Sequence, residues 1–193
     1  QDFKRGMDIA LSLIGLVIAS PILIGAGIAI KLTSPGPVFF KQKRLGKDRM
    51  IFDIYKLRTM KNDAEKETGA VWARENDPRI TLVGRVLRKM HIDEMPQLVN
   101  VLRGEMSIVG PRPERPEIAK DLKKSISDYE KRLNVRPGIT GLAQVWHKYD
   151  ETIEDVKKKI KYDLLYIREM CLMVDLRILA RTVLVVLTGK GAR

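Results

Sequence analysis

The residues best suited to chemistry lie in the stretch from residue 85 to residue 115. Asp93 and Glu94 are adjacent carboxylates just before Pro96, and a proline in this setting predicts the first turn of a helix. The unpaired N–H groups at a helix N-terminus favour anions. A carboxylate held there stays ionised at neutral pH, so either side chain could act as a nucleophile or bind a hard cation such as Mg²⁺.

Basic residues flank this pair on both sides in the sequence. Arg85, Arg88 and Lys89 are three and four residues apart, which places them on one face of an expected helix. Arg112 and Arg115 follow in a proline-rich loop. Two carboxylates, a bound cation and several guanidinium groups are what phosphoryl transfer requires. A capping box, a solvated helix face or a basic patch at a lipid surface would contain the same residues, and spacing alone does not separate these interpretations.

An apolar segment precedes these residues. Residues 9–30 include no charge over 22 positions, and crossing a bilayer takes about 20 apolar residues. Ser20-Pro21 lies at the midpoint, where a proline removes a helical hydrogen bond. Lys4 and Arg5 precede the segment and Lys31 follows it, so the flanking charges give no direction for crossing. A spanning helix and a helix–break–helix segment that enters and leaves through one leaflet both remain open.

The rest of the chain reads as a mostly helical α+β fold. Residues 38–43 and 51–57 are predicted strands, and the turn at 46–48 between them predicts a β-hairpin. Helices are expected over 81–90, 96–103, 117–132 and 153–170, with a glycine-rich loop over 136–141. Residues 172–187 are apolar but include three charges, which predicts an amphipathic helix that packs on the core or lies on a membrane surface.

The composition limits the class of protein. The net charge is +12, and apolar residues make up 45% of the chain, which excludes intrinsic disorder. The single Cys171 has no partner for a disulfide within the chain, and the scattered His91, His147 and Cys171 lack the spacing of zinc ligands. The positive charge indicates an anionic partner, which could be nucleic acid, a phosphorylated substrate or acidic lipid.

Several motifs, taken together, resemble one family. They are Lys4-Arg5-Gly6-Met7-Asp8, Ser20-Pro21, GPVFFKQKRLGKD (36–48), FDIYKLRTM (52–60), DEMPQLVNVLRGEMSIVGPRPE (93–114) and RPGITG (136–141). The residues of these motifs and the order in which they occur resemble those of the monotopic polyprenyl-phosphate phosphoglycosyl transferases, also called bacterial sugar transferases. The chain is similar to a short member of that family or to the catalytic core of a longer one.

The resemblance implies a reaction, its partners and a location. A sugar 1-phosphate would pass from a UDP-sugar to polyprenyl (undecaprenyl) phosphate, giving UMP and a polyprenyl-diphosphate-linked sugar, as the first membrane step of glycoconjugate biosynthesis. Residues 1–34 would form a re-entrant membrane helix broken at Ser20 and Pro21. Residues 35–193 would form the catalytic domain with membrane-surface helices, on the cytoplasmic face of the bacterial inner membrane. Acidic lipids are expected partners, nucleic acid is not, and a homo-oligomer remains open.

The resemblance also implies roles for particular residues. Asp93 would be the nucleophile of a ping-pong mechanism with an aspartyl phosphosugar intermediate, assisted by Glu94. Mg²⁺ would bridge the diphosphate and both carboxylates. The arginines expected to contact phosphate are Arg88, Arg112, Arg58 and Arg136.

Two alternatives stand beside this assignment. In the first, the reaction is the same but lipid phosphate attacks the donor directly and Asp93 serves only as a metal ligand. In the second, the chain is a membrane-anchored basic binding module without catalysis, which the charge would favour equally well. The identity of the sugar is not encoded in any of the motifs.

Overall fold

The computed structural model describes residues 2–64, 77–146 and 153–188. Its α-helices are α1 (Asp2–Thr33), α2 (Leu82–Lys89), α3 (Gln97–Arg103), α4 (Pro116–Ser125), α5 (Leu142–Trp146), α6 (Ile153–Glu169) and α7 (Leu172–Thr188). Its strands are β1 (Phe39–Leu45), β2 (Ile51–Leu57), β3 (Ser107–Val109) and β4 (Gly138–Thr140). Short 3₁₀ turns are η1 (Lys47–Arg49), η2 (Ile92–Glu94) and η3 (Tyr129–Asn134). The mostly helical α+β class expected from the sequence is therefore confirmed.

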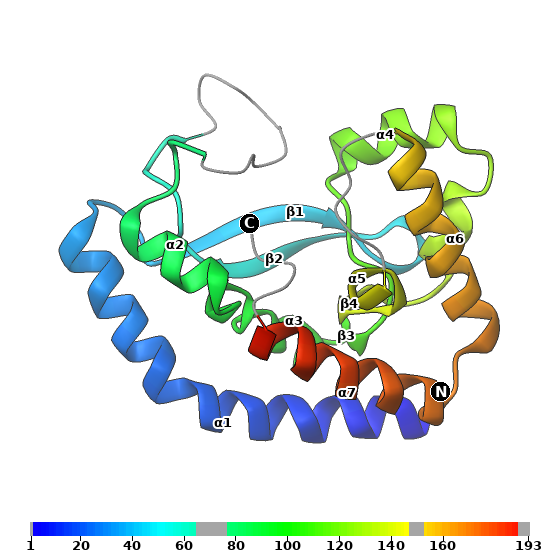
Figure 1. Cartoon of the computed structure of the whole chain (residues 1–193), viewed down its shortest axis with the longest axis horizontal. Coiled ribbons are helices and arrows are strands. Elements are labelled where there is room, and N and C mark those ends of the chain that lie inside the picture. The colour runs from blue at the N-terminus through cyan, green and yellow to red at the C-terminus, as the bar shows by residue number, and fades with distance from the viewer. Residues whose placement is uncertain (1, 65–76, 147–152, 189–193) are drawn as a thin grey trace.

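The apolar segment forms one continuous helix, α1, that runs along a whole side of the molecule and bends about halfway (Figure 1). Pro21 lies inside it without interrupting it, so the expected break is a bend within a single helix. Proline has no N–H to donate to the carbonyl four residues earlier, which is that of Val17. The Ser20 hydroxyl donates to this carbonyl instead, at 2.8 Å. The Ser-Pro pair thus bends the helix while satisfying the freed carbonyl.

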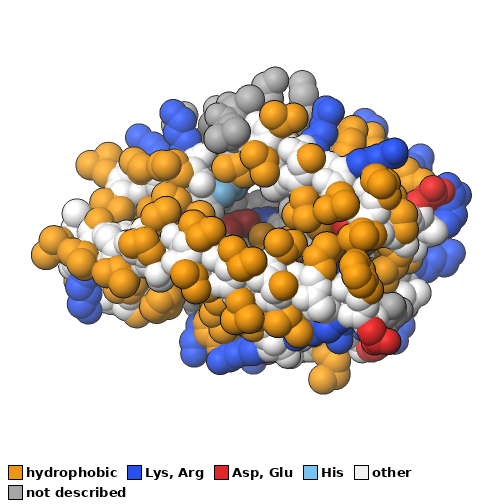
Figure 2. All heavy atoms as spheres, turned by 90° about the horizontal axis from the view of Figure 1, so that it is seen from below, with side chains coloured by type: hydrophobic (Ala, Val, Ile, Leu, Met, Phe, Trp, Pro, Cys, Tyr) orange, Lys and Arg blue, Asp and Glu red, His pale blue; other side chains and the backbone are white. Residues whose placement is uncertain are grey.

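The helix α1 has one buried and one exposed face. Its buried residues recur at intervals of four or seven, which places them on one side: Asp8, Ser12, Ala19, Ala26 and Ile30. On the exposed face the side chains are apolar, including Leu13, Ile14, Val17, Ile18 and Ile24. By its length and composition the helix is apolar enough to cross a membrane. From below, this side of the molecule is covered with hydrophobic side chains (Figure 2).

Polar contacts attach the N-terminal end of α1 to the folded domain. Lys4 donates to Asp175 of α7 at 2.6 Å and to the Tyr166 hydroxyl of α6 at 3.2 Å. Arg5 donates to two carbonyls at the end of α3. The Asp8 carboxylate accepts from the backbone of β3 at 3.0 Å. The basic residues that precede the apolar segment are therefore used inside the protein.

The C-terminal end of α1 is attached to the same domain by apolar packing. Ile30 lies in a buried cluster with Leu57 of β2 and Leu87 of α2. Arg58 donates to the carbonyls of Ser34 and Pro35, just after the helix, at 2.7 and 2.5 Å. Both ends of α1 are thus held by one folded unit.

The predicted hairpin is confirmed. The strands β1 and β2 pair antiparallel, from Phe39 opposite Leu57 to Leu45 opposite Ile51. The turn between them contains η1, where Asp48 and Arg49 adopt left-handed backbone angles. The hairpin lies across the molecule above α1, and α3 contacts both α1 and β2 (Figure 1).

Two expectations about the second half of the chain were wrong. The helix expected over 117–132 ends at Ser125, and a 3₁₀ turn follows from Tyr129. The loop expected over 136–141 contains strand β4, which pairs in parallel with β3. Glycine favours this pairing, because a Cβ at residue 138 would lie 2.1 Å from the backbone nitrogen of Gly110. Glycine here permits close backbone approach rather than a loop.

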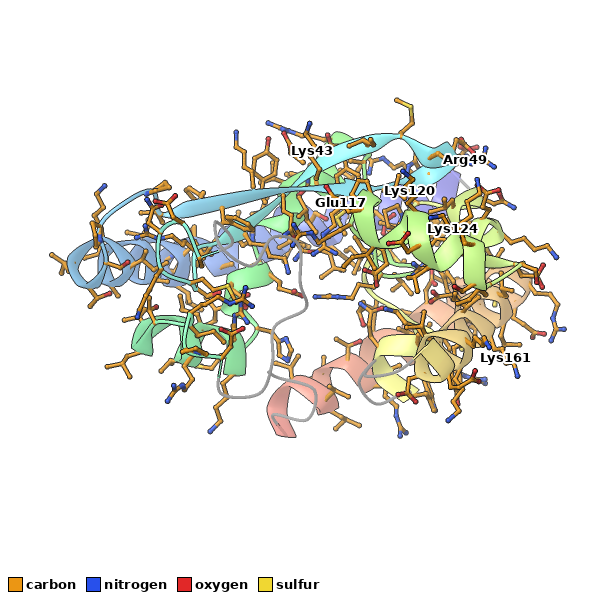
Figure 3. The ribbon with its side chains drawn as sticks, turned by 90° about the horizontal axis from the view of Figure 1, so that it is seen from above. Lys43, Arg49, Glu117, Lys120, Lys124 and Lys161 are labelled. Atoms are coloured by element: carbon orange, nitrogen blue, oxygen red, sulfur yellow. The ribbon has the colours of Figure 1, made fainter. Side chains whose placement is uncertain are left out.

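The predicted amphipathic helix over 172–187 is confirmed as α7. Its inner face buries Ile178 and Asp175, while Met173, Val183 and Leu184 are exposed. The opposite side of the molecule is basic. Seen from above, exposed Lys and Arg side chains project from the hairpin, α4 and α6 (Figure 3). One side of the molecule is therefore apolar and another carries positive charge.

Candidate active site

The turn η2 places both carboxylates where α2 gives way to α3. Thr81 caps the start of α2, where its side chain accepts from the Gly84 N–H, and Met90 caps the end. His91 then takes a left-handed conformation with φ 55°, uncommon for a residue other than glycine. This reversal directs Asp93 and Glu94 inward just before α3.

Glu94 is held by two cations. Lys56 of β2 donates to its Oε1 at 2.7 Å, and Arg112 forms a forked pair with both oxygens at 2.5 and 3.1 Å. Burial acts to raise the pKa of Glu94, but the Arg112 and Lys56 charges hold it well below its usual value. Glu94 is therefore an ionised and fully engaged carboxylate.

Asp93 differs from Glu94 in its hydrogen bonding and in the direction of its pKa shift. It is 7% exposed, and no residue that the structure describes makes a hydrogen bond to its carboxylate. Burial and the charge of Glu94 raise its pKa, against the opposing charges of Lys56 and Arg88. An ionised oxygen with no hydrogen-bonding partner is a stronger nucleophile than a bonded one, and the two environments separate the roles of the carboxylates.

Arg88 approaches the same site from α2. Its Nε donates to the Thr59 hydroxyl at 2.8 Å. Burial lowers the pKa of Arg88, while the charge of Asp93 acts in the opposite direction. The helix can lie this close because residue 84 is glycine, where a Cβ would stand 2.0 Å from the Thr59 carbonyl oxygen. We call the charged residues gathered here the site cluster: Lys56, Arg88, Asp93, Glu94 and Arg112.

A second group of buried charges lies behind the loop that carries Arg112. Its members are Arg44, Glu114, Arg132, Lys159 and Asp163, which we call the support cluster. Arg132 and Asp163 pair at 2.7 Å with side chains only 3% and 2% exposed. Lys159 binds Glu114 at 2.9 Å.

The support cluster holds the backbone of the site. The Nη2 of Arg132 donates to the carbonyl of Arg112 at 2.7 Å, and Arg44 donates to the carbonyl of Pro113 at 2.8 Å. Burial acts to raise the pKa of Glu114, but the Lys159 and Arg132 charges lower it to about 2.

Four of the six residues expected to bind substrate or act in catalysis come together: Asp93, Glu94, Arg88 and Arg112. The other two are bonded to backbone carbonyls. Arg58 is buried against Ser34 and Pro35, and the exposed Arg136 donates to Gly104 at 2.9 Å. Their role as phosphate contacts stays a prediction.

Lys56 is a site residue that the sequence analysis missed. A signal was present, since Phe52 and Ile54 are buried and Lys56 is the next residue of β2 in the same alternation, although Leu57 at the end of the strand is buried as well. A lysine at an inward position of a strand needs a partner, because burying its charge alone is costly. Glu94 is that partner.

The residues present fit Mg²⁺ held mainly by substrate. Within the described ranges, no group of three His, Cys, Asp or Glu side chains could enclose a metal ion. Mg²⁺ commonly uses one or two carboxylates and takes its remaining ligands from phosphates and water. Asp93 offers such a carboxylate, whereas the oxygens of Glu94 already accept from Lys56 and Arg112.

The surface above this region is hollowed. Seen from below, the middle of the hydrophobic side opens into a hollow in which a histidine and acidic side chains are visible (Figure 2). His91 is the histidine among the described residues, and it lies two residues before Asp93. The hollow therefore opens beside the loop that holds the carboxylates, on the apolar side of the molecule.

The chain is similar to known proteins over almost its whole length. The family model for bacterial sugar transferases matches residues 1–189. The chain is 45% identical over 190 residues to a UDP-N-acetylgalactosamine-undecaprenyl-phosphate N-acetylgalactosaminephosphotransferase of Aeromonas hydrophila, covering 98% of this chain and 45% of that protein. It is 42% identical over 191 residues to a UDP-glucose:undecaprenyl-phosphate glucose-1-phosphate transferase of Escherichia coli K12, covering 98% of this chain and 41% of that protein.

A third relative is similar in length. It is the exopolysaccharide production protein PSS of Rhizobium leguminosarum, 41% identical over 194 residues and covering 97% of each chain. The chain thus spans less than half the length of the first two relatives and nearly all of the third. Because the family model matches residues 1–189 of the 193 in the chain, the chain belongs to the bacterial sugar transferases.

Proposed function

We propose that the chain transfers a sugar 1-phosphate from a UDP-sugar to polyprenyl phosphate at the cytoplasmic face of the bacterial inner membrane. Family membership and the names of the relatives support this reaction class. The observation that carries the mechanism is the contrast between the two carboxylates: Asp93 is buried and unbonded, while Glu94 is tied to Arg112 and Lys56.

In the first step, an Asp93 oxygen attacks the sugar-bearing phosphorus of the UDP-sugar. The bond from that phosphorus to the oxygen bridging both phosphates breaks, and UMP leaves with the bridging oxygen. The product is an aspartyl phosphosugar. Because nucleophile and leaving group are both anionic oxygens, no proton has to move, and a general base is not required.

In the second step, an oxygen of polyprenyl phosphate attacks the same phosphorus. The bond between Asp93 and phosphorus breaks, which regenerates the carboxylate and releases the polyprenyl-diphosphate-linked sugar. The covalent intermediate means that the two anionic substrates need not occupy the site together. Their charges therefore do not have to be neutralised at the same moment.

The cations around Asp93 would stabilise the charge of the transferred group. Arg88 already acts on the Asp93 carboxylate, and Arg112 can turn from Glu94 toward a phosphate with the same forked geometry. Glu94, itself bound by Lys56, would keep Arg112 in place between turnovers. Bound Mg²⁺, held by Asp93 and the substrate phosphates, would supply charge neutralisation for the diphosphate.

The attachment of α1 supports a re-entrant position in one leaflet. A helix that crossed the bilayer would put its two ends on opposite sides, about 30 Å apart across the hydrocarbon. Here Lys4 is bonded to α7 while Arg58 and Ile30 bind the other end to β2. One folded unit holds both ends, so α1 can dip into the leaflet with its apolar face and return, which brings the hollow beside Asp93 to the lipid surface (Figure 2).

UMP release tests the reaction. The full chain in detergent is given undecaprenyl phosphate, Mg²⁺ and each member of a panel of UDP-sugars, and Asp93→Asn is run beside it. Release with one donor, lost in the variant, is the expected result and identifies the sugar. Release that survives in Asp93→Asn would contradict the nucleophile, and no release with any donor would favour a basic binding module.

A second experiment separates the covalent mechanism from direct attack by lipid phosphate. Labelled UMP is incubated with unlabelled UDP-sugar and enzyme in the absence of lipid acceptor. A covalent intermediate permits label to enter the UDP-sugar, since the first step runs backward with the labelled UMP. Direct attack permits no exchange, because nothing breaks the diphosphate until the acceptor arrives.

A further inference from the structure

Gln97, the first residue of α3, is a buried amide without a partner. The residue is 1% exposed, and its Nε2 is buried with no hydrogen bond. No side-chain hydrogen bond from Gln97 to any residue of the described ranges is found. A buried donor left unpaired destabilises a fold, so an amide retained in this position calls for a reason.

The backbone places Gln97 beside Asp93. The turn η2 covers Ile92–Glu94, and Met95 (φ −56°, ψ −34°) and Pro96 (φ −60°, ψ −17°) continue in right-handed helical conformation into α3. Residues four apart in such a run lie on the same face, and Gln and Asp at this spacing can hydrogen-bond. The Asp93 carboxylate also lacks a hydrogen bond to any residue described. An unpaired donor therefore neighbours an unpaired acceptor.

A second amide in the same helix shows what a structural role looks like. Asn100 is 0% exposed, and each end of its side chain is used. Its Nδ2 donates to the Asp53 carbonyl and to Glu105, each at 2.7 Å, and its Oδ1 accepts from the Tyr55 N–H at 3.1 Å. The Asn100 side chain links α3 to β2 by hydrogen bonds, whereas the Gln97 side chain links α3 to no other described element.

We propose that Gln97 is the positioning residue for Asp93. In the substrate complex its amide donates to one carboxylate oxygen, which directs the other oxygen at the sugar-bearing phosphorus. Hydrogen bonds at catalytic groups are often unformed in the free enzyme and close only with substrate bound. The inference rests on the proposed function, in that it assigns an orienting partner to the proposed nucleophile.

Gln97→Leu tests the assignment, because leucine has a similar volume and no donor. With the preferred UDP-sugar, kcat should fall about tenfold to a hundredfold, since a hydrogen bond to a charged group is lost. KM for the UDP-sugar should stay within about twofold, because a group that only orients the nucleophile does not bind the ground state. The midpoint of thermal unfolding should be unchanged or higher.

Asn100→Leu is the matched control. It removes three hydrogen bonds of a buried amide in the same helix, so the midpoint of thermal unfolding should fall while kcat of the folded enzyme is retained. Should Gln97→Leu fail to fold, Gln97→Glu keeps the shape and replaces the donor with an acceptor facing Asp93, and the same loss of kcat is expected.

Three results would overturn the assignment: an unchanged kcat, a loss confined to KM, or a loss of activity that merely follows a lower unfolding midpoint. Asp93→Asn in the same series separates this failure from that of the proposed function. If Asp93→Asn is inactive and Gln97→Leu is fully active, the inference alone fails. If Asp93→Asn is active, both fail, because Asp93 is then not the group that needs orienting.

Discussion

The site cluster and the support cluster adjoin one another at the loop that carries Arg112 and Glu114, and they are built from the same residue types. Arg112 points into the first and pairs with Glu94, while Glu114, two residues later, points into the second and pairs with Lys159. In the support cluster each carboxylate has a cation in contact. In the site cluster Asp93 has none within hydrogen-bonding distance. Burial of charge is thus common to both, and the unpaired carboxylate distinguishes the place where chemistry can occur.

The largest expected effect on the reaction rate comes from replacing Asp93, the carboxylate of the site cluster that has no hydrogen bond. Asp93→Asn should lower UMP release at least about a thousandfold, because an amide cannot replace the nucleophile. The free energy of unfolding should stay equal or rise, since burial and Glu94 raise the pKa of this carboxyl and its charge costs the fold stability. Rate assays and chemical denaturation of the same preparations check both. A less stable variant would show that Asp93 has a structural partner.

The support cluster should respond in the opposite sense. Glu114→Gln leaves Lys159 buried without its carboxylate, and breaking a buried pair costs about 3–5 kcal/mol. The rate per folded molecule should change little, because the Glu114 carboxylate pairs with Lys159 and Arg44, which lie outside the site cluster. Denaturation curves together with rates corrected for the folded fraction test this. A rate loss at full stability would place Glu114 in the chemistry.

A smaller loss is expected where the site cluster keeps a second cation. Lys56→Met leaves Glu94 with Arg112 alone, and losing a hydrogen bond to a charged group costs about 1.5–3 kcal/mol, or about tenfold to a hundredfold in rate. Lys43→Met, on the exposed side of the hairpin (Figure 3), is the control and should leave the rate unchanged. Equal rates in the two variants would remove Lys56 from the site.

The pH dependence of stability gives the smallest effect. The pKa of Glu114 is about 2 in the folded protein against an ordinary 4.5, so its stabilising contribution is complete above pH 4.5 and is lost as the pH falls toward 2. By pH 4 the loss amounts to about 1 kcal/mol. Denaturation at several pH values should show this slope in the parent chain and a shallower one in Glu114→Gln. Identical slopes would assign the dependence to other groups.

The helices and strands that carry local sequence signals were predicted correctly. Those that depend on contacts between residues far apart in the chain were not. Thr81, which precedes a run of apolar residues at helical spacing, correctly predicted the start of α2. Gly104 correctly predicted the end of α3. Strand β4 was missed, because a three-residue strand carries no alternation and exists only through its pairing with β3. The end of the helix at Ser125 was missed for a related reason, since apolar spacing continues past it.

For the site, the residue types indicated Asp93, Glu94 and Arg112. They did not indicate that the two carboxylates have different roles. Adjacent residues have the same sequence context, and only the fold gives Glu94 two cations while leaving Asp93 unbonded. The support cluster was equally hidden. Arg132 and Asp163 are 31 residues apart, and neither spacing nor composition links them.

The attachment of α1 has a consequence for biogenesis. Lys4 finds its partner Asp175 only 171 residues later in the chain. During synthesis the apolar helix leaves the ribosome before α6 and α7, the helices that hold its N-terminal end, have been made. The contacts between the N-terminal end of α1 and α7 must therefore form late. Contacts between residues so far apart in sequence slow folding and leave apolar surface exposed until they form. Early contact with lipid would cover that surface, so the bilayer would assist the folding of this protein.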